Sequence, residues 1–261
     1  MPLALHFKTA GAGEPIVILH GLFGSAGNWS SVAKRLQKAY HVVSADLRNH
    51  GDSPHAKSMS YAEMAEDVLA LLDRLALGKT NLIGHSLGGK VAMVCALLRP
   101  ERVKRLVVVD TAPVAYSRRF DDLIQSMQAL PLDQLGGRSE ADHWLSHDIA
   151  EQGLRQFLLQ NLRFADGHYR WRIDLKAITA NMDAIIGFPP FDTSYTGETG
   201  FMRGEKSGYL CQEYLPQITR YFPNSSVATI PNAGHWPHSE QPERFMALLF
   251  QILRRNDSEE P

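Results

Sequence analysis

The sequence predicts an α/β fold with a mostly parallel central sheet, helices on both faces and an inserted helical cap. Short runs rich in Val, Ile and Leu recur between amphipathic helical stretches, which is typical of parallel strands joined by helical crossovers. The runs expected to form the sheet are Pro15 to His20, His41 to Asp46, Thr80 to His85, Val103 to Asp110, Gly200 to Gly204 and Ser226 to Ile230. A long interruption of this alternation predicts the cap. The length of 261 residues suits one such domain with an insertion.

Local signals define the first edge of the sheet and the clearest helix. Leu3 to Phe7 is expected to be an antiparallel edge strand with a hairpin through Gly11 and Gly13, because the connection is too short for a helical crossover. Ser60 and Glu63 have capping-box spacing, in which hydroxyl and carboxylate each satisfy a free backbone N–H, and predict the start of a helix. Its core-facing residues, at helical spacing, are Tyr61, Met64, Ala65, Val68, Leu71, Leu72 and Leu75.

The interruption begins near Ala115 and contains two amphipathic segments that we expect to be helices, Asp121 to Leu130 and Gly153 to Phe164. The alternation then resumes and ends in a helix over Pro242 to Arg255, followed by a polar tail that we expect to be solvated. The predicted organisation is a first core part over 1–114, a cap over 115–198 and a second core part over 199–261. We expect the cap to lie over the sheet as a lid.

Composition restricts the partners. The formal net charge is -1 and the pI is about 6.8, so nothing in the overall charge attracts nucleic acid or an anionic membrane surface. The two cysteines, Cys95 and Cys211, have neither metal-type nor CxxC spacing, and we expect no disulfide framework. No signal peptide or membrane-spanning run is found, which predicts a cytoplasmic location. The oligomeric state is left open.

The segment Gly84-His85-Ser86-Leu87-Gly88 combines a strand, a sharp turn and a helix, and fits the G-x-S-x-G nucleophile elbow. The two glycines leave room where a Cβ would collide with a neighbouring strand or helix. Two alternatives are a turn without chemistry and a phosphate-binding loop, since Gly84-x4-Gly89-Lys90 matches most of that motif. Val91 stands where the metal-binding hydroxyl of a phosphate-binding loop belongs, which disfavours the second alternative.

A second glycine turn, His20-Gly21-Leu22, ends an earlier strand. Such a turn can aim a backbone N–H at a substrate oxygen, so the N–H groups of Leu22 and Leu87 are the candidates for an oxyanion hole. The alternative is an ordinary loop in which His20 only hydrogen-bonds the backbone.

The candidate general base is His235, in a loop between the last strand and the last helix. An imidazole suits this role because its pKa lies near neutrality. His238 is the rival, but Gly234 gives His235 the flexible turn. His143 and His147 have helical spacing, yet no carboxylate or cysteine set completes a metal site with them.

These residues together resemble the α/β-hydrolase superfamily and, within it, the small YbfF-type bacterial esterases. The resemblance covers roughly Pro15 to Pro113 and Gly200 to Phe250, and it is carried by His20 to Ser25, Asp46 to Ser53, Gly84 to Gly89, Val109 to Pro113 and Gly234-His235. It implies the α/β-hydrolase fold and ester hydrolysis. The Asp46 to Ser53 segment looks like a structural turn, and we assign it no catalytic role.

The acid of the expected triad is where this chain departs from the common pattern of the superfamily. That pattern places an aspartate after the strand ending near Met202, where this chain has Ser207. Asp110 ends the strand expected beside the nucleophile strand, and from the same edge a carboxylate could orient His235. YbfF-type esterases similarly look to use this earlier acid. Glu205 is the alternative, and Asp110 would then only support the loop into the cap.

The expected reaction is two-step hydrolysis of carboxylic esters, or of acyl thioesters such as acyl-CoA, through an acyl-enzyme on Ser86, with no cofactor and no metal. The same fold also occurs in lyases, perhydrolases and C–C hydrolases, and a ligand-binding receptor with low turnover is a further alternative. Apolar cap residues that could line an acyl site, although most should simply pack on the core, are Leu123, Ile124, Met127, Phe157 and Leu158. Cations that could meet an anionic leaving group are Arg118, Arg119, Arg170, Arg172 and Lys176.

Overall fold

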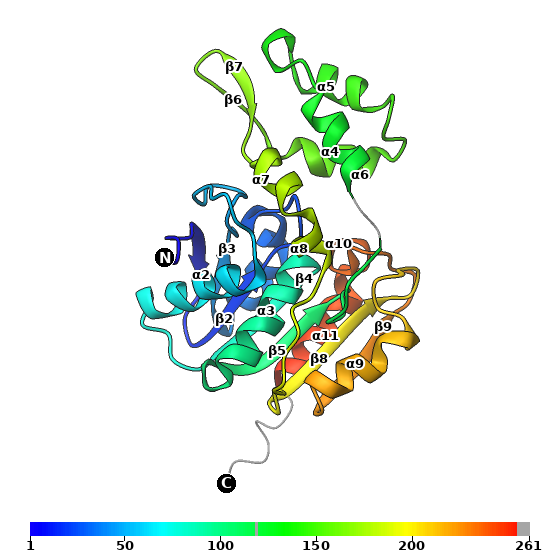
Figure 1. Ribbon diagram of the computed structural model, residues 1–261. Helices are drawn as coiled ribbons and strands as arrows, with labels where there is room; N and C mark the ends of the chain where they lie inside the picture. The colour runs from blue at the N-terminus through cyan, green and yellow to red at the C-terminus, as the bar shows by residue number, and fades with distance from the viewer. Residues whose placement is uncertain (118–119, 255–261) are drawn as a thin grey trace.

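A computed structural model describes residues 1–117 and 120–254, and shows a core with a cap above it (Figure 1). The core sheet has seven strands in the order β1-β3-β2-β4-β5-β8-β9, and all neighbouring pairs are parallel except the antiparallel pair β1 and β3. The strands are β1 Phe7–Ala10, β2 Glu14–Leu19, β3 Tyr40–Ala45, β4 Thr80–His85, β5 Val103–Val109, β8 Glu198–Gly204 and β9 Ser225–Ile230. The predicted mostly parallel sheet is confirmed.

Helices cover both faces of this sheet, as expected from strands that are apolar on both sides. The helices of the core are α1 Ser30–Leu36, α2 Tyr61–Arg74, α3 Leu87–Leu98, α9 Leu215–Tyr221, α10 Pro237–Glu240 and α11 Pro242–Arg254, with short 3-10 turns at Ala26–Trp29, Pro100–Arg102 and Gln212–Tyr214. Alternate residues of β2 belong to different apolar clusters: Val17 packs with residues of α2 and α3, and Ile18 packs with residues of α1 and α11. The strand β2 therefore separates two apolar cores.

The first edge strand differs from the prediction in its residues and in its pairing. The strand runs over Phe7–Ala10 rather than Leu3 to Phe7, and it pairs antiparallel with β3 instead of forming a hairpin with β2. The connection from β1 to β2 crosses the start of β3. At Gly11, whose φ is +76°, an added Cβ would lie 2.3 Å from the Tyr40 carbonyl oxygen, so glycine permits this crossing.

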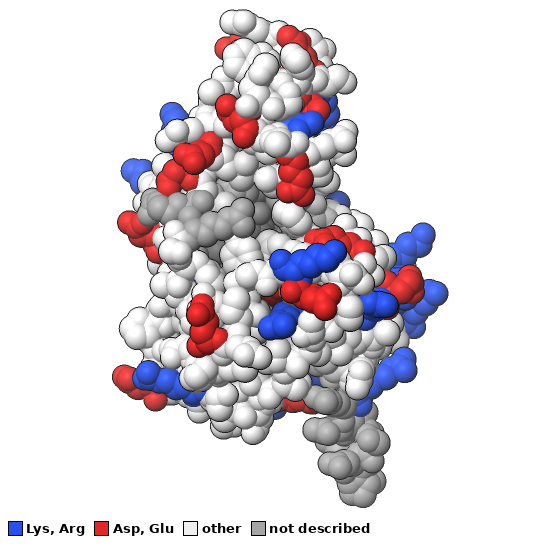
Figure 2. Space-filling view, turned by 90° about the vertical axis from the view of Figure 1, so that its right-hand side faces the viewer, with Lys and Arg blue, Asp and Glu red and all other residues white. Residues whose placement is uncertain are grey.

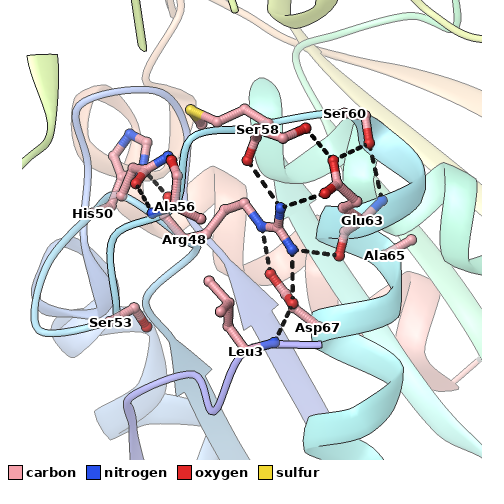
Figure 3. Close-up of polar contacts among 12 residues, drawn as sticks. Leu3, Arg48, His50, Ser53, Ala56, Ser58, Ser60, Glu63, Ala65 and Asp67 are labelled. Carbon is pink, nitrogen blue, oxygen red and sulfur yellow. Dashed lines mark hydrogen bonds and ion pairs between the residues drawn. The ribbon is translucent and has the colours of Figure 1, made fainter. Parts of the chain in front are cut away.

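The helix predicted from the Ser60 cap is confirmed as α2, and Ser60 Oγ accepts the Glu63 N–H over 3.3 Å. The other half of the capping box differs, because the Glu63 carboxylate accepts the hydroxyls of Ser60 and Ser58 instead of a backbone N–H. This end of α2 also holds a buried ion pair, in which Arg48 donates to both carboxylate oxygens of Asp67 over 2.7 and 2.9 Å (Figure 3). Asp67 accepts the Leu3 N–H as well, so the pair joins the N-terminus to α2.

The cap lies between β5 and β8 and is not wholly helical, contrary to expectation. Its elements are α4 Asp121–Gln128, the 3-10 turn Leu132–Gln134, α5 Arg138–Leu145, α6 Gln152–Leu159, β6 Leu162–Ala165, β7 His168–Trp171, α7 Leu175–Ala180 and α8 Met182–Ile186. The predicted helix Gly153 to Phe164 ends at Leu159, and its last residues belong to the hairpin β6-β7. Asp166 and Gly167 both have positive φ, which suits the tight turn of a two-residue hairpin.

Both connections between core and cap meet at Lys90, on the first turn of α3. Its buried Nζ donates to the carbonyl oxygens of Val114 (2.8 Å), on the connection into the cap, and of Ile186 (2.8 Å) and Gly187 (2.6 Å), on the connection out of it. Tyr116 N–H also donates to the Ile186 carbonyl over 2.9 Å. The two connections are thus bonded to each other and to α3.

The last helix agrees with its predicted start, and the predicted tail over 256–261 lies outside the described residues. A search of the described chain for a helix long and apolar enough to cross a bilayer finds none.

Candidate active site

Ser86 occupies a strained turn between β4 and α3, with φ +51° and ψ -117°. A Cβ on Gly84 would lie 2.2 Å from the Gly88 carbonyl oxygen, and one on Gly88 would lie 2.5 Å from the carbonyl oxygens of Leu19 and His20. Only glycine fits at these two positions, as the sequence pattern predicted. The Ser86 N–H donates to Val109 O over 3.0 Å, which ties the turn to the neighbouring strand β5.

Asp110 follows β5 directly and is fully buried. Its Oδ2 lies 2.7 Å from His235 Nδ1, although the two residues are 125 positions apart. Carboxylate oxygens accept hydrogen bonds, so Nδ1 is the donor in this pair and Nε2 remains available for another partner. The structure thus brings together the acid and the base that the sequence singled out.

Three further contacts hold the Asp110 carboxylate in place. Gly204 N–H donates to Oδ1 over 2.9 Å, and the Ser207 hydroxyl donates to Oδ2. Asp110 N–H in turn donates to Met202 O over 2.8 Å. Ser207, at the place where the common pattern has an aspartate, therefore contacts the acid that replaces it.

The alternative acid, Glu205, points elsewhere. Its side chain is exposed, and its Oε2 accepts the Asn232 N–H over 2.8 Å, which braces the loop before His235. The geometry therefore favours Asp110 over Glu205.

The loop that carries His235 is held by two more histidines. His85, beside Ser86, donates from Nε2 to the His235 carbonyl oxygen over 2.7 Å, and burial lowers its pKa well below the usual value, so the ring is neutral. His238, the rival base, stacks on Trp29 with ring centroids 4.3 Å apart. Burial lowers the pKa of His238 to about 4, and its Nδ1 is buried without a hydrogen-bond partner in the described part of the chain. His238 is thus a packing residue in the wall of the site.

The glycine turn after β2 lies against the elbow. A Cβ on Gly21 would be 2.8 Å from His85 Nδ1 and 3.2 Å from Ser86 Cβ, so this backbone passes close to the serine. Among the described residues, His20 hydrogen-bonds backbone groups: Nδ1 donates to Gly21 O over 2.8 Å, and Nε2 accepts the Leu47 N–H over 3.0 Å. These bonds fix the shape of the turn that ends in Leu22. His20 itself thus has a structural role, as one of the two interpretations of the sequence proposed.

Ser86 opens into two cavities. The larger has a volume of about 500 Å³ and is lined by Ser86, His235 and apolar side chains from the core and the cap. The smaller, about 30 Å³, is lined by Ser86 and Leu87 but not by His235. Leu22 borders both. The two backbone groups expected to form an oxyanion hole therefore belong to residues that flank Ser86.

Comparison with known proteins assigns the family. The sequence model of the α/β-hydrolase fold family matches residues 14–242. The chain belongs to the α/β-hydrolase family. It is 42% identical over 256 residues to the sn-1-specific diacylglycerol lipase ABHD11 of Danio rerio, covering 95% of this chain and 81% of that protein. It is 33% identical over 241 residues to esterase YbfF of Escherichia coli (strain K12), covering 92% and 93%.

A solved structure described as a marine microorganism esterase superposes with a TM-score of 0.93 at 39% identity, covering 96% of this chain and 99% of that one. The predicted resemblance to the α/β-hydrolases and YbfF-type esterases is confirmed. Relatives named esterase and lipase support a carboxylic ester hydrolase.

The predicted cap residues divide between packing and lining. Leu123 and Phe157 line the larger cavity, whereas Ile124, Met127 and Leu158 are buried in the apolar core. Of the predicted cations, Arg170 pairs with Asp166, Arg172 pairs with Asp52 and Lys176 is exposed, and none of these three lines the cavity. Arg118 and Arg119 lie outside the described residues.

Acidic groups border the larger cavity instead. Asp122, Asp148 and Glu151 line it and are exposed, so they lie toward its mouth. Figure 2 shows more acidic than basic side chains scattered over the upper part of this face. Within the described chain, no lysine or arginine lines this cavity.

The described residues offer one cluster with metal-type chemistry, His6, Asp46 and Asp52, whose ligand atoms lie within 4.8 Å of one another. Asp46 is already used in the structural turn of this α/β-hydrolase: it accepts the N–H groups of Ala26 (2.7 Å) and Asp52 (2.9 Å). Burial opposes ionisation of Asp46, but these hydrogen bonds outweigh it and lower its pKa. The cluster therefore fits the structural turn predicted for residues 46–53.

The environment of Lys90 argues against the alternative that residues 84–90 form a phosphate-binding loop. All three of its hydrogen bonds go to the carbonyl oxygens at the cap connections, so the ammonium is not presented to a ligand.

Sequence reasoning missed two contributors to the site. Tyr209 stacks on the His235 ring with centroids 4.1 Å apart, and His85 bonds the His235 backbone. The position of His85 next to the expected nucleophile was a usable signal. Tyr209 had none, because its contact joins two loops that only the fold brings together.

Proposed function

We propose that this chain hydrolyses carboxylic esters through an acyl-enzyme on Ser86, with His235 as general base and Asp110 as its orienting acid. The 2.7 Å bond between His235 Nδ1 and the buried Asp110 carboxylate carries the proposal, because it fixes the orientation of the imidazole in the cavity that Ser86 lines. We also propose that residues 115–198 are the lid of this site, between core parts 1–114 and 199–261.

The chemistry follows from these positions. His235 Nε2 takes the Ser86 hydroxyl proton while Oγ bonds to the ester carbonyl carbon, and the negative oxygen is met by the N–H groups of Leu22 and Leu87. The nearby N-terminus of α3 favours the same charge. The carbon–oxygen bond to the alcohol then breaks, and the alcohol leaves with the proton from His235. Water activated by His235 releases the acid and restores Ser86. Each step uses side chains and backbone of this chain alone.

The carboxylates at the cavity mouth favour neutral esters over substrates with several negative charges, because like charges repel where water is partly excluded. Relatives named diacylglycerol lipase and esterase agree with a neutral ester substrate. Acyl thioesters such as acyl-CoA, which the sequence suggested through cations of the cap, are the less favoured candidate, because Arg170, Arg172 and Lys176 do not line the cavity. We also propose a cytoplasmic location, as expected from the sequence.

The test is hydrolysis of p-nitrophenyl acetate by the wild-type chain and by Ser86→Ala, followed by mass spectrometry after fluorophosphonate treatment. We expect turnover in the wild type, a loss of roughly three or more orders of magnitude in the variant, and one adduct on Ser86. Ser239→Ala, at an exposed position of α10, is a matched control that should retain both activity and the adduct on Ser86.

Absence of both turnover and adduct would overturn the proposal. Adduct formation with tight product retention and very slow release would instead indicate the ligand-binding receptor. Acyl-CoA hydrolysis measured in parallel decides whether thioesters belong among the substrates.

A further inference from the structure

The two cavities at Ser86, called here the large lobe and the small lobe, differ about seventeenfold in volume. The large lobe has about 500 Å³ and the small lobe about 30 Å³. A lobe of 30 Å³ holds roughly one or two water-sized groups, whereas the large lobe has the size of a site for a whole small molecule. An ester bound across Ser86 must place its acyl chain and its alcohol on different sides of the carbonyl carbon.

The position of His235 decides which side is which. The leaving alcohol takes its proton from His235, so its oxygen must lie on the His235 side of the reacting carbon. His235 lines the large lobe only, and Leu87, a candidate oxyanion donor, lines the small lobe only. The alcohol therefore extends into the large lobe, and the acyl chain is directed toward the small lobe.

The walls of the small lobe are bonded in place. Tyr61, which is buried, donates its hydroxyl to Ile185 O over 2.6 Å. Lys90 donates all three of its protons to carbonyl oxygens of the cap connections. Since these polar groups are satisfied and close-packed, the wall resists displacement by a longer chain.

We propose, on the basis of the proposed function, that this esterase is selective for short acyl groups, acetyl or propionyl, esterified to larger apolar alcohols. The large lobe supplies the apolar surface for such an alcohol through side chains such as Leu123, Leu154 and Phe157. The selectivity arises from overpacking, because each methylene beyond the small lobe must displace a buried wall.

Octyl acetate and ethyl octanoate test this selectivity directly, because they are isomers with opposite placement of the long chain about the carbonyl. We expect kcat/KM for octyl acetate to exceed that for ethyl octanoate by at least about tenfold, since a few misplaced methylenes discriminate by 10- to 200-fold in hydrophobic sites. Equal values, or preference for ethyl octanoate, would overturn the inference.

Two variants locate the effect. Ile185→Ala opens the small lobe and should raise kcat/KM for ethyl octanoate relative to octyl acetate several-fold. Ile173→Ala, which truncates a buried isoleucine outside both lobes, is the matched control and should leave the ratio of the two kcat/KM values unchanged. The wild-type ratio remains decisive if Ile185→Ala fails to fold.

The test separates this inference from the proposed function. Hydrolysis of either isomer that Ser86→Ala abolishes supports the serine esterase, whatever the ratio, and only the ratio decides the acyl selectivity. A wild-type chain that hydrolyses neither isomer and no p-nitrophenyl acetate would overturn both.

Discussion

The ends of β5 and β8 lie side by side at the same edge of the sheet, and a carboxylate stands just after each strand. Asp110, after β5, is fully buried and contacts His235, whereas Glu205, after β8, is exposed and braces Asn232. The two acids are close in space and similar in chemistry, yet only one faces the imidazole. The direction of the backbone, more than proximity in the fold, decides which of the two carboxylates contacts His235.

The backbone of Asp110 explains the difference. Its φ is +51°, a conformation rare for residues with a Cβ, and hydrogen bonds from both sides maintain it: its own N–H to Met202 O, and the Gly204 N–H to its carboxylate. Two backbone groups at the end of β8, Met202 O and Gly204 N–H, thus hold Asp110 in this conformation.

The largest expected effect comes from Asp110→Asn. The amide can donate as well as accept, which favours the wrong His235 tautomer, and kcat for p-nitrophenyl acetate should fall by about 10⁴-fold. Steady-state kinetics measure this, with circular dichroism as the check on folding. A folded variant with near wild-type kcat would show that Asp110 is not the acid.

A second prediction concerns the loop that brings His235 to Asp110. Burial lowers the pKa of His238 to about 4, from 6.5 in the unfolded chain. As the pH falls from 6.5 toward 4, His238 therefore binds a proton in the unfolded chain but not in the folded one, and the free energy of unfolding decreases. His238→Phe keeps the stack on Trp29 and removes this titration. Between about pH 7.5 and about pH 5, the wild type should lose about 2 kcal/mol more of its unfolding free energy than the variant.

Urea unfolding at both pH values checks this prediction. His143→Gln, an exposed cap histidine, is the control and should follow the wild type. Parallel pH profiles for His238→Phe and wild type would show that His238 is not held neutral by burial.

A smaller effect is expected from Ser207→Ala. The variant loses one donor to the carboxylate that orients His235, and a hydrogen bond to a charged group contributes about 1.5–3 kcal/mol. If about 1.4 kcal/mol of this contribution acts on the transition state, its loss lowers kcat about tenfold. Ser207→Thr keeps the hydroxyl and should recover most of the rate. In the Asp110→Asn background the same change should have little effect, because the two residues act as one unit.

The smallest effect is expected from Glu205→Gln, which should leave kcat within about twofold of wild type because the amide oxygen can still accept the Asn232 N–H. If this variant lost as much activity as Asp110→Asn, the contrast between the two strand ends would be wrong.

Much of this contrast could be predicted from the sequence, because the deciding constraints were local. Gly84 and Gly88 indicated the elbow since no Cβ fits there, and the parallel order of the strands placed Asp110 beside Ser86. The sequence predicts no role for the Ser207 hydroxyl, because its contact with Asp110 spans 97 positions and depends on the conformation of the loop after β8.

The cap was harder to predict for a different reason. Apolar spacing over Gly153 to Phe164 fitted a helix, but the turn at Asp166-Gly167 followed by His168–Trp171 made a hairpin the better pairing for the last residues. The Asp-Gly pair between two short runs was a usable hairpin signal. The sequence indicates Lys90 only as part of a phosphate-binding motif. Its contacts with the cap connections are not predictable from the motif, because the carbonyl partners lie 24 to 97 positions away.

Lys90 has a consequence for how such a molecule can change. The chain leaves the core and returns to it at one point, where Tyr116 N–H bonds Ile186 O and one ammonium spans both backbones. The core therefore holds the cap at one attachment point, Lys90. A different cap inserted between Val114 and Gly187 needs only carbonyl oxygens at the same spacing, and the turn of Ser86 need not change. Substrate range and catalytic machinery can then diversify as separate modules of one gene.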